Sequence, residues 1–251
     1  MARSKLKPFE AFTDNISDAE TLLSYAVALK NQRPRRMRRE LRECIRTTLK
    51  IPKKKMERFD YLVSNDLLLV FIPGGTLSRN SFDDLRPLLR QSLVAACAAL
   101  ETYIADKAMD FVGQALYTDE TPPRMREIQL TVGRWAEIES RYKRRQWGIR
   151  SVVEDHIREN SSTAPNKIAQ VLSTVGVQNW LKRVDVARNV SKGKTIQELE
   201  AITKRRNRIA HTADRQGRGR ASIASEEVRG HIETIKSVVV ATEAMLSDHS
   251  L

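Results

Sequence analysis

Apolar side chains recur every three or four residues along most of the chain, as they do in amphipathic helices. The pattern is clear between residues 18 and 29, where the apolar positions are Ala19, Leu22, Leu23, Ala26 and Leu29. The same periodicity predicts further helices over residues 33–49, 84–116, 124–146, 168–179 (a continuation to 184 is open), 195–213 and 225–246. Long helices joined by modest loops predict an all-α helical bundle.

One region interrupts the helical pattern. Residues 67–72 are a short apolar run that predicts a strand or a tight buried turn, and the stretch 73–81, which begins Pro-Gly-Gly, is the best candidate for a linker. We therefore expect two parts, a basic and mostly helical N-terminal extension over residues 1–80 and a helical domain over residues 81–251.

The charge balance suggests the kind of partner. The chain carries 44 Lys and Arg residues against 31 Asp and Glu, a formal net charge of +13 at pH 7. Such an excess favours polyanions, of which nucleic acid is the commonest. It does not distinguish binding from cleavage or RNA from DNA, and a basic surface without such a partner remains open. For the basic residues between 33 and 58, a phosphate-binding face and a solvated helix surface are both open.

The sequence gives no sign of a membrane or a metal. No apolar run approaches the roughly 18 residues that a membrane span requires. The residues from Met1 to Leu6 lack the apolar core of a secretory signal. Cys44 and Cys97 lie far apart in helical patterns, which is typical of two buried thiols rather than of a disulfide or a metal site. We expect a cytoplasmic protein with no cofactor.

The segment 195–213 combines a helix start with an unexpected charge. Thr195 and Glu198 have the spacing of a capping box. From this start, one apolar face of the helix is formed by Ile196, Leu199, Ile202, Ile209, Ala210 and Ala213. Arg206 lies in the middle of that face, whereas Arg205 and Arg208 point to other sides. A guanidinium there needs either a structural carboxylate or an anionic ligand.

Asn207 and His211 lie four residues apart, so they are stacked one turn apart at the edge of the apolar face. The amide of Asn207 is placed to fix the ring orientation or tautomer of His211. An arginine for phosphate charge, a histidine for proton transfer and an orienting amide suit phosphodiester chemistry. Arg206 and His211 diverge by about 140° around an ideal helix, so one helix alone does not bring them together.

The sequence Arg206-Asn207-Arg208-Ile209-Ala210-His211 resembles the Rx4–6H motif of the HEPN superfamily. Its setting, residues 204–214, is similar to the RiboL-PSP-HEPN subgroup, and residues 93–104 are similar to an earlier helix of that subgroup. The resemblance covers residues 84–246 and leaves residues 1–80 without a counterpart. It implies a four- or five-helix bundle that dimerises with two motifs facing each other across a cleft.

The resemblance also implies an activity, namely metal-independent cleavage of RNA by attack of the 2′-hydroxyl, leaving a cyclic phosphate. His211 would be the general acid or base, Arg206 would stabilise the phosphorane, and Asn207 would orient the histidine. A toxin or anti-phage defence role follows from it, with a homodimer and a neutralising antitoxin or a sensor protein as partners. Two alternatives stay open: a non-catalytic HEPN module that binds nucleic acid or acts as an adaptor, and a DNA-binding protein that uses residues 33–58.

Glu101 is a further candidate for the site. Its helical neighbours three and four residues away are apolar, so its carboxylate needs a cation, and Arg206 is the unpaired one. A catalytic and a structural role for Glu101 are both open. Asp214 is considered only as a cap, in a position that the helix dipole disfavours. Tyr103 and Trp135 lie at helical spacing among apolar residues and are expected in the core rather than as base-stacking platforms.

Overall fold

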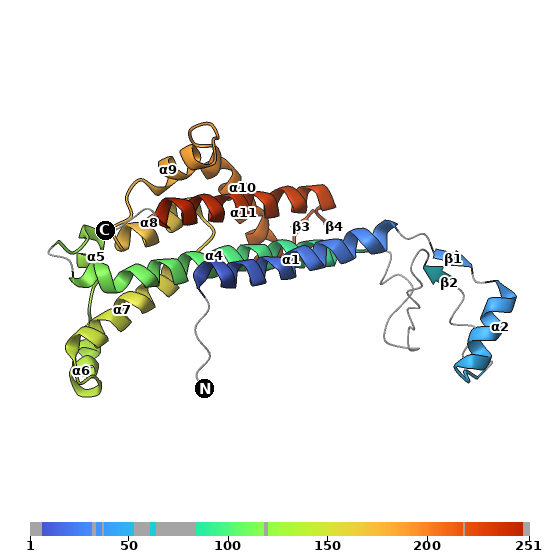
Figure 1. The fold of residues 1–251 in the computed structure, drawn as a ribbon, viewed down its shortest axis with the longest axis horizontal. Coiled ribbons are helices and arrows are strands. Elements are labelled where there is room, and N and C mark those ends of the chain that lie inside the picture. Colours follow the sequence, from blue (N-terminus) through green and yellow to red (C-terminus); the bar gives the residue numbers. More distant parts are fainter. Residues whose placement is uncertain are drawn as a thin grey trace.

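The structure is a computed structural model that describes residues 7–31, 34–36, 38–52, 61–63, 84–117, 120–217 and 219–247. Helices make up nearly all of the secondary structure in these ranges, which confirms the all-α prediction (Figure 1). Two antiparallel pairs of very short strands are the exceptions among the described residues. The predicted strand or turn at 67–72 and the predicted linker at 73–81 lie outside the described residues.

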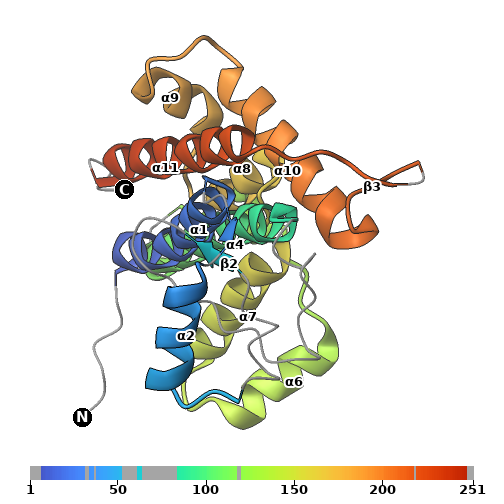
Figure 2. The same ribbon diagram turned by 90° about the vertical axis from the view of Figure 1, so that its right-hand side faces the viewer.

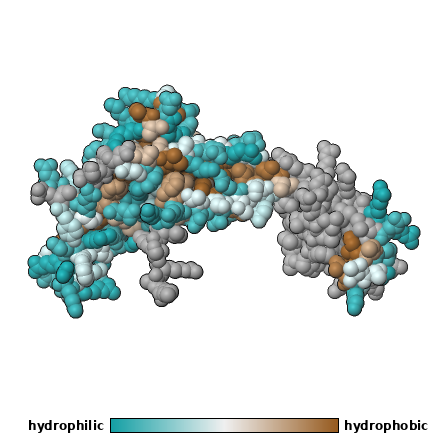
Figure 3. Space-filling view, viewed as in Figure 1, coloured by the Kyte–Doolittle hydropathy of each residue, from teal (hydrophilic) through white to brown (hydrophobic). Residues whose placement is uncertain are grey.

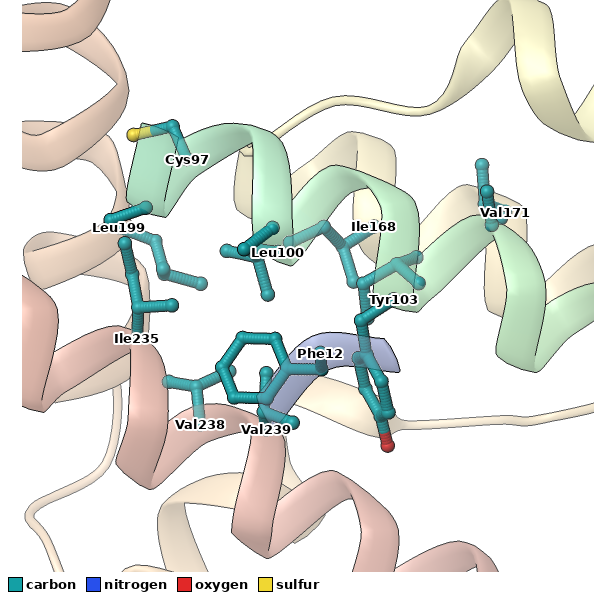
Figure 4. Close-up of a cluster of buried hydrophobic side chains, with 14 of the residues drawn as sticks. Phe12, Cys97, Leu100, Tyr103, Ile168, Val171, Leu199, Ile235, Val238 and Val239 are labelled. Atoms are coloured by element: carbon teal, nitrogen blue, oxygen red, sulfur yellow. The ribbon is translucent and has the colours of Figure 1, made fainter. Parts of the chain in front are cut away.

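A long helix, α4 (Arg86–Tyr117), is the spine of the bundle. Along it lie α1 (Pro8–Asn31), α11 (Ser225–Ser247) and part of α7 (Arg145–Asn160) (Figures 1 and 2). The leucine and alanine side chains of α4 let its neighbours approach closely and bury one continuous core. Figure 4 shows the centre of this core, which includes Phe12, Leu100, Tyr103, Leu199, Ile235 and Val239.

Helix α1 is part of this core. Phe12 is buried, and its ring meets that of Tyr103 edge to face with centroids 5.7 Å apart. The hydroxyl of Ser92 on α4 donates to the backbone oxygen of Ala19 at 2.7 Å. The first helix of the predicted extension over residues 1–80 therefore packs into the bundle, because its apolar stripe is covered by α4 and α11. The boundary at residue 80 lies outside the described residues and stays a prediction.

The other described N-terminal elements lie beyond the end of α1, away from the bundle (Figure 1). They are α2 (Arg39–Thr48) and the strands β1 (Pro34–Arg36) and β2 (Tyr61–Val63), which pair antiparallel with Pro34 opposite Val63. The basic helix predicted in this region therefore starts later than expected. A proline disfavours helical backbone in the residue before it and has no N–H to donate, and this is consistent with the strand at Pro34.

The prediction of one helix over residues 124–146 is wrong. The structure has α5 (Pro123–Arg126), then α6 (Val132–Arg141), and α7 starts at Arg145. The hydroxyl of Thr131 caps α6 by accepting a hydrogen bond from its backbone, and Tyr142 is extended, so α6 ends before α7 begins. This local capping decides against a continuous helix, although the apolar periodicity runs through the break.

The C-terminal part contains α8 (Pro165–Thr174), α9 (Trp180–Ala187), α10 (Lys194–Thr212) and a hairpin of β3 (Arg215–Gln216) and β4 (Gly219–Arg220), followed by α11. The helices predicted over residues 195–213 and 225–246 are confirmed, with ends shifted by at most one residue. The helix predicted over residues 168–179 ends earlier, at Thr174, and its possible continuation to 184 is instead the separate helix α9. Helix α10 crosses the side of the bundle and contacts α4, α8, α9 and α11. The predicted motif therefore lies on a helix that is fixed by four others.

The face of the molecule seen in Figure 3 is mostly polar, with apolar residues in bands along the bundle. None of the described helices combines the length and the apolar composition that a membrane crossing requires. Cys97 is buried but Cys44 is exposed, so the prediction of two buried thiols is wrong for Cys44.

Candidate active site

The start of α10 is held by a carboxylate from α9. Asp185 accepts hydrogen bonds from the backbone N–H groups of Gly193 and Thr195 at 2.6 and 3.0 Å. Burial acts to raise the pKa of Asp185, but the hydrogen bonds from Thr195 and Gly193 outweigh it, and the pKa lies below its ordinary value. The predicted capping box of Thr195 and Glu198 is therefore wrong, because α10 begins at Lys194 with Gly193 as its N-cap and Asp185 from the neighbouring helix accepts from the N–H of Thr195.

Arg188 binds the side chains that were expected to form that box. Its Nη1 donates to Thr195 Oγ1 and its Nη2 to the carboxylate of Glu198, both at 2.8 Å. Its Nε donates to Ser237 Oγ on α11 at 2.9 Å. The motif helix is thus tied to both α9 and α11 before the motif itself begins.

In the second half of α10, Arg206 meets Glu101 of α4. Nη2 of Arg206 donates to both carboxylate oxygens of Glu101, each at 2.9 Å. Nη1 donates to Oδ1 of Asn207 at 3.1 Å. The predicted pairing of Glu101 with Arg206 is confirmed, while a catalytic role for either residue stays a prediction. Both side chains of the pair are partly exposed, so the guanidinium is oriented without being sealed off from solvent.

Glu101 also fixes the loop that leads into α8. Its Oε1 accepts a hydrogen bond from the N–H of Thr163 at 3.3 Å, and the hydroxyl of Thr203 on α10 donates to Thr163 Oγ1 at 2.9 Å. Cys97 lies one turn before Glu101, and burial raises the pKa of its thiol to about 12. The thiol is therefore protonated at neutral pH and is not a nucleophile.

The buried face of α10 differs from the predicted one. Arg205 is buried together with Leu199 and Ile202, whereas Ala210 and Ala213 are exposed. The helical wheel placed Arg205 away from the core because the buried face was assigned to the side with the most apolar residues. In the folded chain the charge of Arg205 is neutralised by a buried carboxylate, which the sequence pattern of the helix does not predict.

That carboxylate is Asp214, whose side chain has no solvent exposure at 0%. Its oxygens lie 3.1 Å from Nε of Arg90 on α4, 3.1 Å from Nη1 of Arg205 and 3.5 Å from Nη2 of Arg208. Ala213 and Asp214 have positive φ angles of 49° and 59°, so the chain leaves α10 in a left-handed turn that carries the carboxylate beneath the helix end. Asp214 is thus far more than the weak cap that was predicted.

The sequence held one signal for this cluster. Arg90 stands among leucines in the pattern of α4, and a guanidinium there needs a partner. Its Nη2 donates to the backbone oxygen of Ala221 at 2.8 Å, while Nη2 of Arg205 donates to that of Ser222 at 2.5 Å. The two arginines therefore fix the strand hairpin as well as the end of the motif helix.

His211 lies in the last turn of α10 and is exposed. Within the described ranges, the imidazole of His211 makes no hydrogen bond or ion pair. The amide oxygen of Asn207 accepts a hydrogen bond from Arg206. Orientation of His211 by Asn207 stays a prediction.

A pocket of about 520 Å³ opens beside the motif, between α10 and the start of α8. It is lined by Ala164, Pro165, Glu200, Thr203, Lys204, Asn207, Arg208 and Thr212, most of which are polar residues, although most of the surface they present to the pocket is apolar. The volume is in the range of pockets that hold small ligands. Asn207 brings the motif to the pocket wall, and His211 lies one helical turn further along.

The structure brings the guanidinium of Arg206 and the amide of Asn207 together, while the imidazole of His211 lies on the same helix with no hydrogen bond to either among the described residues. These groups suit the binding of an anion and the transfer of a proton. Across the residues that the structure describes, no group of three or more His, Cys, Asp or Glu side chains is placed to hold a metal ion.

Comparison with known proteins adds one finding. A family model described as RiboL-PSP-HEPN matches residues 60–248, which include all of α4 to α11, Glu101 and the motif on α10. No curated protein and no solved structure matches the chain significantly. The matched region is three quarters of the chain, and it agrees with the resemblance seen in residues 93–104 and 204–214. The chain therefore belongs to the RiboL-PSP-HEPN family, within the HEPN superfamily.

Proposed function

We propose that this protein is a metal-independent endoribonuclease that cleaves RNA by attack of the 2′-hydroxyl. The observation that carries the proposal is the Arg206 guanidinium, held by Glu101 on one side and bonded on the other to Asn207, which lines the pocket beside the motif. The exposed imidazole of His211 lies on the same helix. Membership of the HEPN superfamily supports a nuclease or RNA-related function.

In this mechanism the 2′-oxygen attacks the adjacent phosphorus and the bond from phosphorus to the 5′-oxygen breaks. The products are a 2′,3′-cyclic phosphate and a 5′-hydroxyl. One proton leaves the 2′-hydroxyl and one is delivered to the 5′-oxygen. His211 transfers a proton, and Arg206 stabilises the negative charge that builds up on the phosphorane.

We further propose that two copies of the chain complete the site. The reaction needs two proton transfers, and within one motif His211 is the only imidazole. Arg206 is turned toward Glu101 on α4, whereas His211 is exposed, as expected for residues about 140° apart on the helix. A second motif facing the first supplies both a second imidazole and a route for Arg206 and His211 to act on one phosphate.

The first experiment compares cleavage of single-stranded RNA in EDTA by the wild type, Arg206→Ala and His211→Ala. We expect the wild type to leave cyclic phosphate ends and each variant to lose at least about 100-fold in rate. His156→Ala is the matched control. Like His211, His156 lies four residues from an asparagine on the same helix, in this case Asn160 on α7. Equal cleavage by all four proteins would refute the proposal.

The second experiment tests the shared site. Wild-type chains are mixed with an excess of His211→Ala chains and allowed to exchange subunits, and light scattering gives the oligomeric state. If two copies complete each site, the rate per wild-type chain falls as the excess grows. A rate that depends only on the amount of wild type, as with an excess of an unrelated protein, would contradict a shared site.

The family resemblance supports a place for this activity in a microbial conflict system, as a toxin or an anti-phage effector in the cytoplasm. A neutralising antitoxin or a sensor protein is the partner that such a role requires. The alternative function is a non-catalytic module that binds RNA or acts as an adaptor. It predicts RNA binding without cyclic phosphate ends in the first experiment, and His211→Ala would then be silent.

A further inference from the structure

The α6–α7 hairpin (residues 132–160) stands out from the bundle (Figures 1 and 2). Helix α7 packs against α4 and α8, whereas α6 lies away from them (Figure 1). The proposed chemistry uses none of its residues. Its tip, where α6 ends and α7 begins, reads Arg-Tyr-Lys-Arg-Arg over residues 141–145.

Two tryptophans on this hairpin face solvent. Trp135 is 41% exposed and Trp147 is 55% exposed, so the prediction that Trp135 lies in the core is wrong. The guanidinium of Arg145 lies 5.7 Å from the ring centre of Trp135, and that of Arg144 lies 5.6 Å from the ring centre of Trp147. Each indole is therefore paired with a cation while part of its surface stays open.

The exposure of these rings is not the result of a loose hairpin. Ile138 of α6 is buried against Gly148 of α7, where a Cβ atom would come within 2.5 Å of the isoleucine side chain. Arg134 spans the two helices, with 2.6 Å between its Nη2 and Asp155. The hairpin thus has its own packed contact, and the tryptophans are held outside it.

The charge of the hairpin tip favours an anion. Residues 134–150 contain six Arg and Lys residues against two Glu. Arg141 and Arg145 pair with glutamates of α6. Lys143 and Arg144 are exposed, and neither forms an ion pair with any carboxylate in the described part of the chain.

We propose that this hairpin is a binding arm for single-stranded RNA, with bases stacked on Trp135 and Trp147 and phosphates bound by Lys143 and Arg144. Flat aromatic surfaces combined with unpaired cations are the features that bind unpaired nucleotides irrespective of sequence. The choice of RNA as the ligand rests on the proposed ribonuclease function.

The arm is joined directly to the candidate active site. Helix α7 has 16 residues and so spans about 24 Å. It ends at Asn160, three residues before Thr163, whose N–H binds Glu101, and the pocket begins at Ala164. An RNA strand bound at the tip of the hairpin is therefore held on α7, the helix that leads to the pocket. This raises the local concentration of RNA at the pocket.

The test measures binding to a fluorescein-labelled, single-stranded oligouridine with 2′-O-methyl groups, by fluorescence anisotropy. This RNA has no 2′-hydroxyl to attack, so binding is measured whether or not the chain is a ribonuclease. We expect each of Trp135→Ala and Trp147→Ala to weaken binding about ten-fold, and phenylalanine at either position to restore most of it. Tyr25→Ala, which removes another exposed aromatic ring, on α1, should bind as the wild type does.

The charges are tested by titrating salt. Loss of both Lys143 and Arg144 to alanine should reduce the slope of log affinity against log salt concentration by about 1.4, since each phosphate contact on a single strand contributes about 0.7. Loss of Lys182 and Lys192, which are also exposed, should leave the slope unchanged. A fully paired RNA duplex should compete poorly, because its bases are stacked on one another.

Three results would each overturn the proposal of a binding arm. They are unchanged binding in both alanine variants, a loss of binding that phenylalanine does not restore, and equal competition by the duplex. These results are independent of the proposed chemistry. If the arm fails, His211-dependent cleavage of short RNA still stands. If His211→Ala leaves cleavage unchanged, binding of the uncleavable RNA by the arm still stands.

Discussion

Replacing Asp214 by asparagine should destabilise the protein strongly. Asparagine has nearly the same shape and also tolerates the left-handed backbone at this position, so the change mainly removes the negative charge. The side chains of Arg90 and Arg205 are only 6% and 9% exposed. Arg90 loses its carboxylate partner, and Arg205 keeps only the partly exposed Glu227, 3.3 Å from its Nε. Breaking a buried ion pair in this way costs about 3–5 kcal/mol.

A loss of this size is a large part of the roughly 5–15 kcal/mol that stabilises a folded domain. The melting temperature of a chain of this length should fall by about 6–20 °C. Denaturant unfolding followed by circular dichroism at 222 nm, together with a thermal melt, measures both quantities. Asp155→Asn is the matched control. Its pair with Arg134 is shorter, at 2.6 Å, but Asp155 is 43% exposed, and solvated pairs are worth only about 0–1 kcal/mol.

The reasoning holds that burial of the ion pair, and not its length, sets the free energy lost. It would be refuted if Asp214→Asn lost no more stability than Asp155→Asn. A second variant checks the cause. In the Asp214→Asn background, Arg205→Leu should recover part of the lost free energy of unfolding, since it removes a buried cation whose remaining carboxylate partner, Glu227, is 36% exposed. Further destabilisation in the double variant would instead mean that Arg205 contributes mainly by its other contacts.

Three further predictions concern other parts of the molecule. Gly148→Ala should lower the free energy of unfolding by about 1–3 kcal/mol, because the new Cβ meets Ile138 at 2.5 Å, and Ile138→Ala should relieve that strain in a double variant. Burial lowers the pKa of His231 below 6.5, so as the pH falls the unfolded chain binds this proton at a higher pH than the folded chain does. The free energy of unfolding is therefore full above pH 6.5 and declines as the pH falls through the folded pKa, and His231→Gln should reduce this decline in urea titrations. Glu101→Gln should cost about 1–3 kcal/mol in the same urea titrations, as it leaves Arg206 with a neutral partner; no change in stability would contradict a supporting role for Glu101.

The local sequence pattern was sufficient for three of the long helices and for one tertiary contact. Periodicity placed the long spine helix and the last two helices within a few residues of their observed ends. The pairing of Glu101 with Arg206 followed because each charge stood among apolar residues on its own helix, and each needed a partner. Two isolated charges of opposite sign in two apolar stripes are a strong constraint, so this contact was predictable.

Other features depended on groups that are distant in sequence. Asp185 of α9 accepts the hydrogen bond from the N–H of Thr195 in place of the expected capping box. This could not be predicted, because the periodicity of α10 contains no information on the side chains of a neighbouring helix. Arg205 became a core residue because a left-handed turn after α10 brings Asp214 beneath it. The exposure of Trp135 depended on the break between α6 and α7, which the apolar pattern does not mark.

The sequence by itself determined that the chain is helical, which residues form the motif and that Glu101 and Arg206 attract each other, because these follow from spacing and from the cost of burying a lone charge. Only the tertiary structure decided which face of α10 is buried, where Asp214 goes and that the α6–α7 hairpin holds its tryptophans in solvent. These outcomes depend on which elements pack together, since burial of a polar or aromatic side chain is set by its neighbours in space and not by its neighbours in the chain.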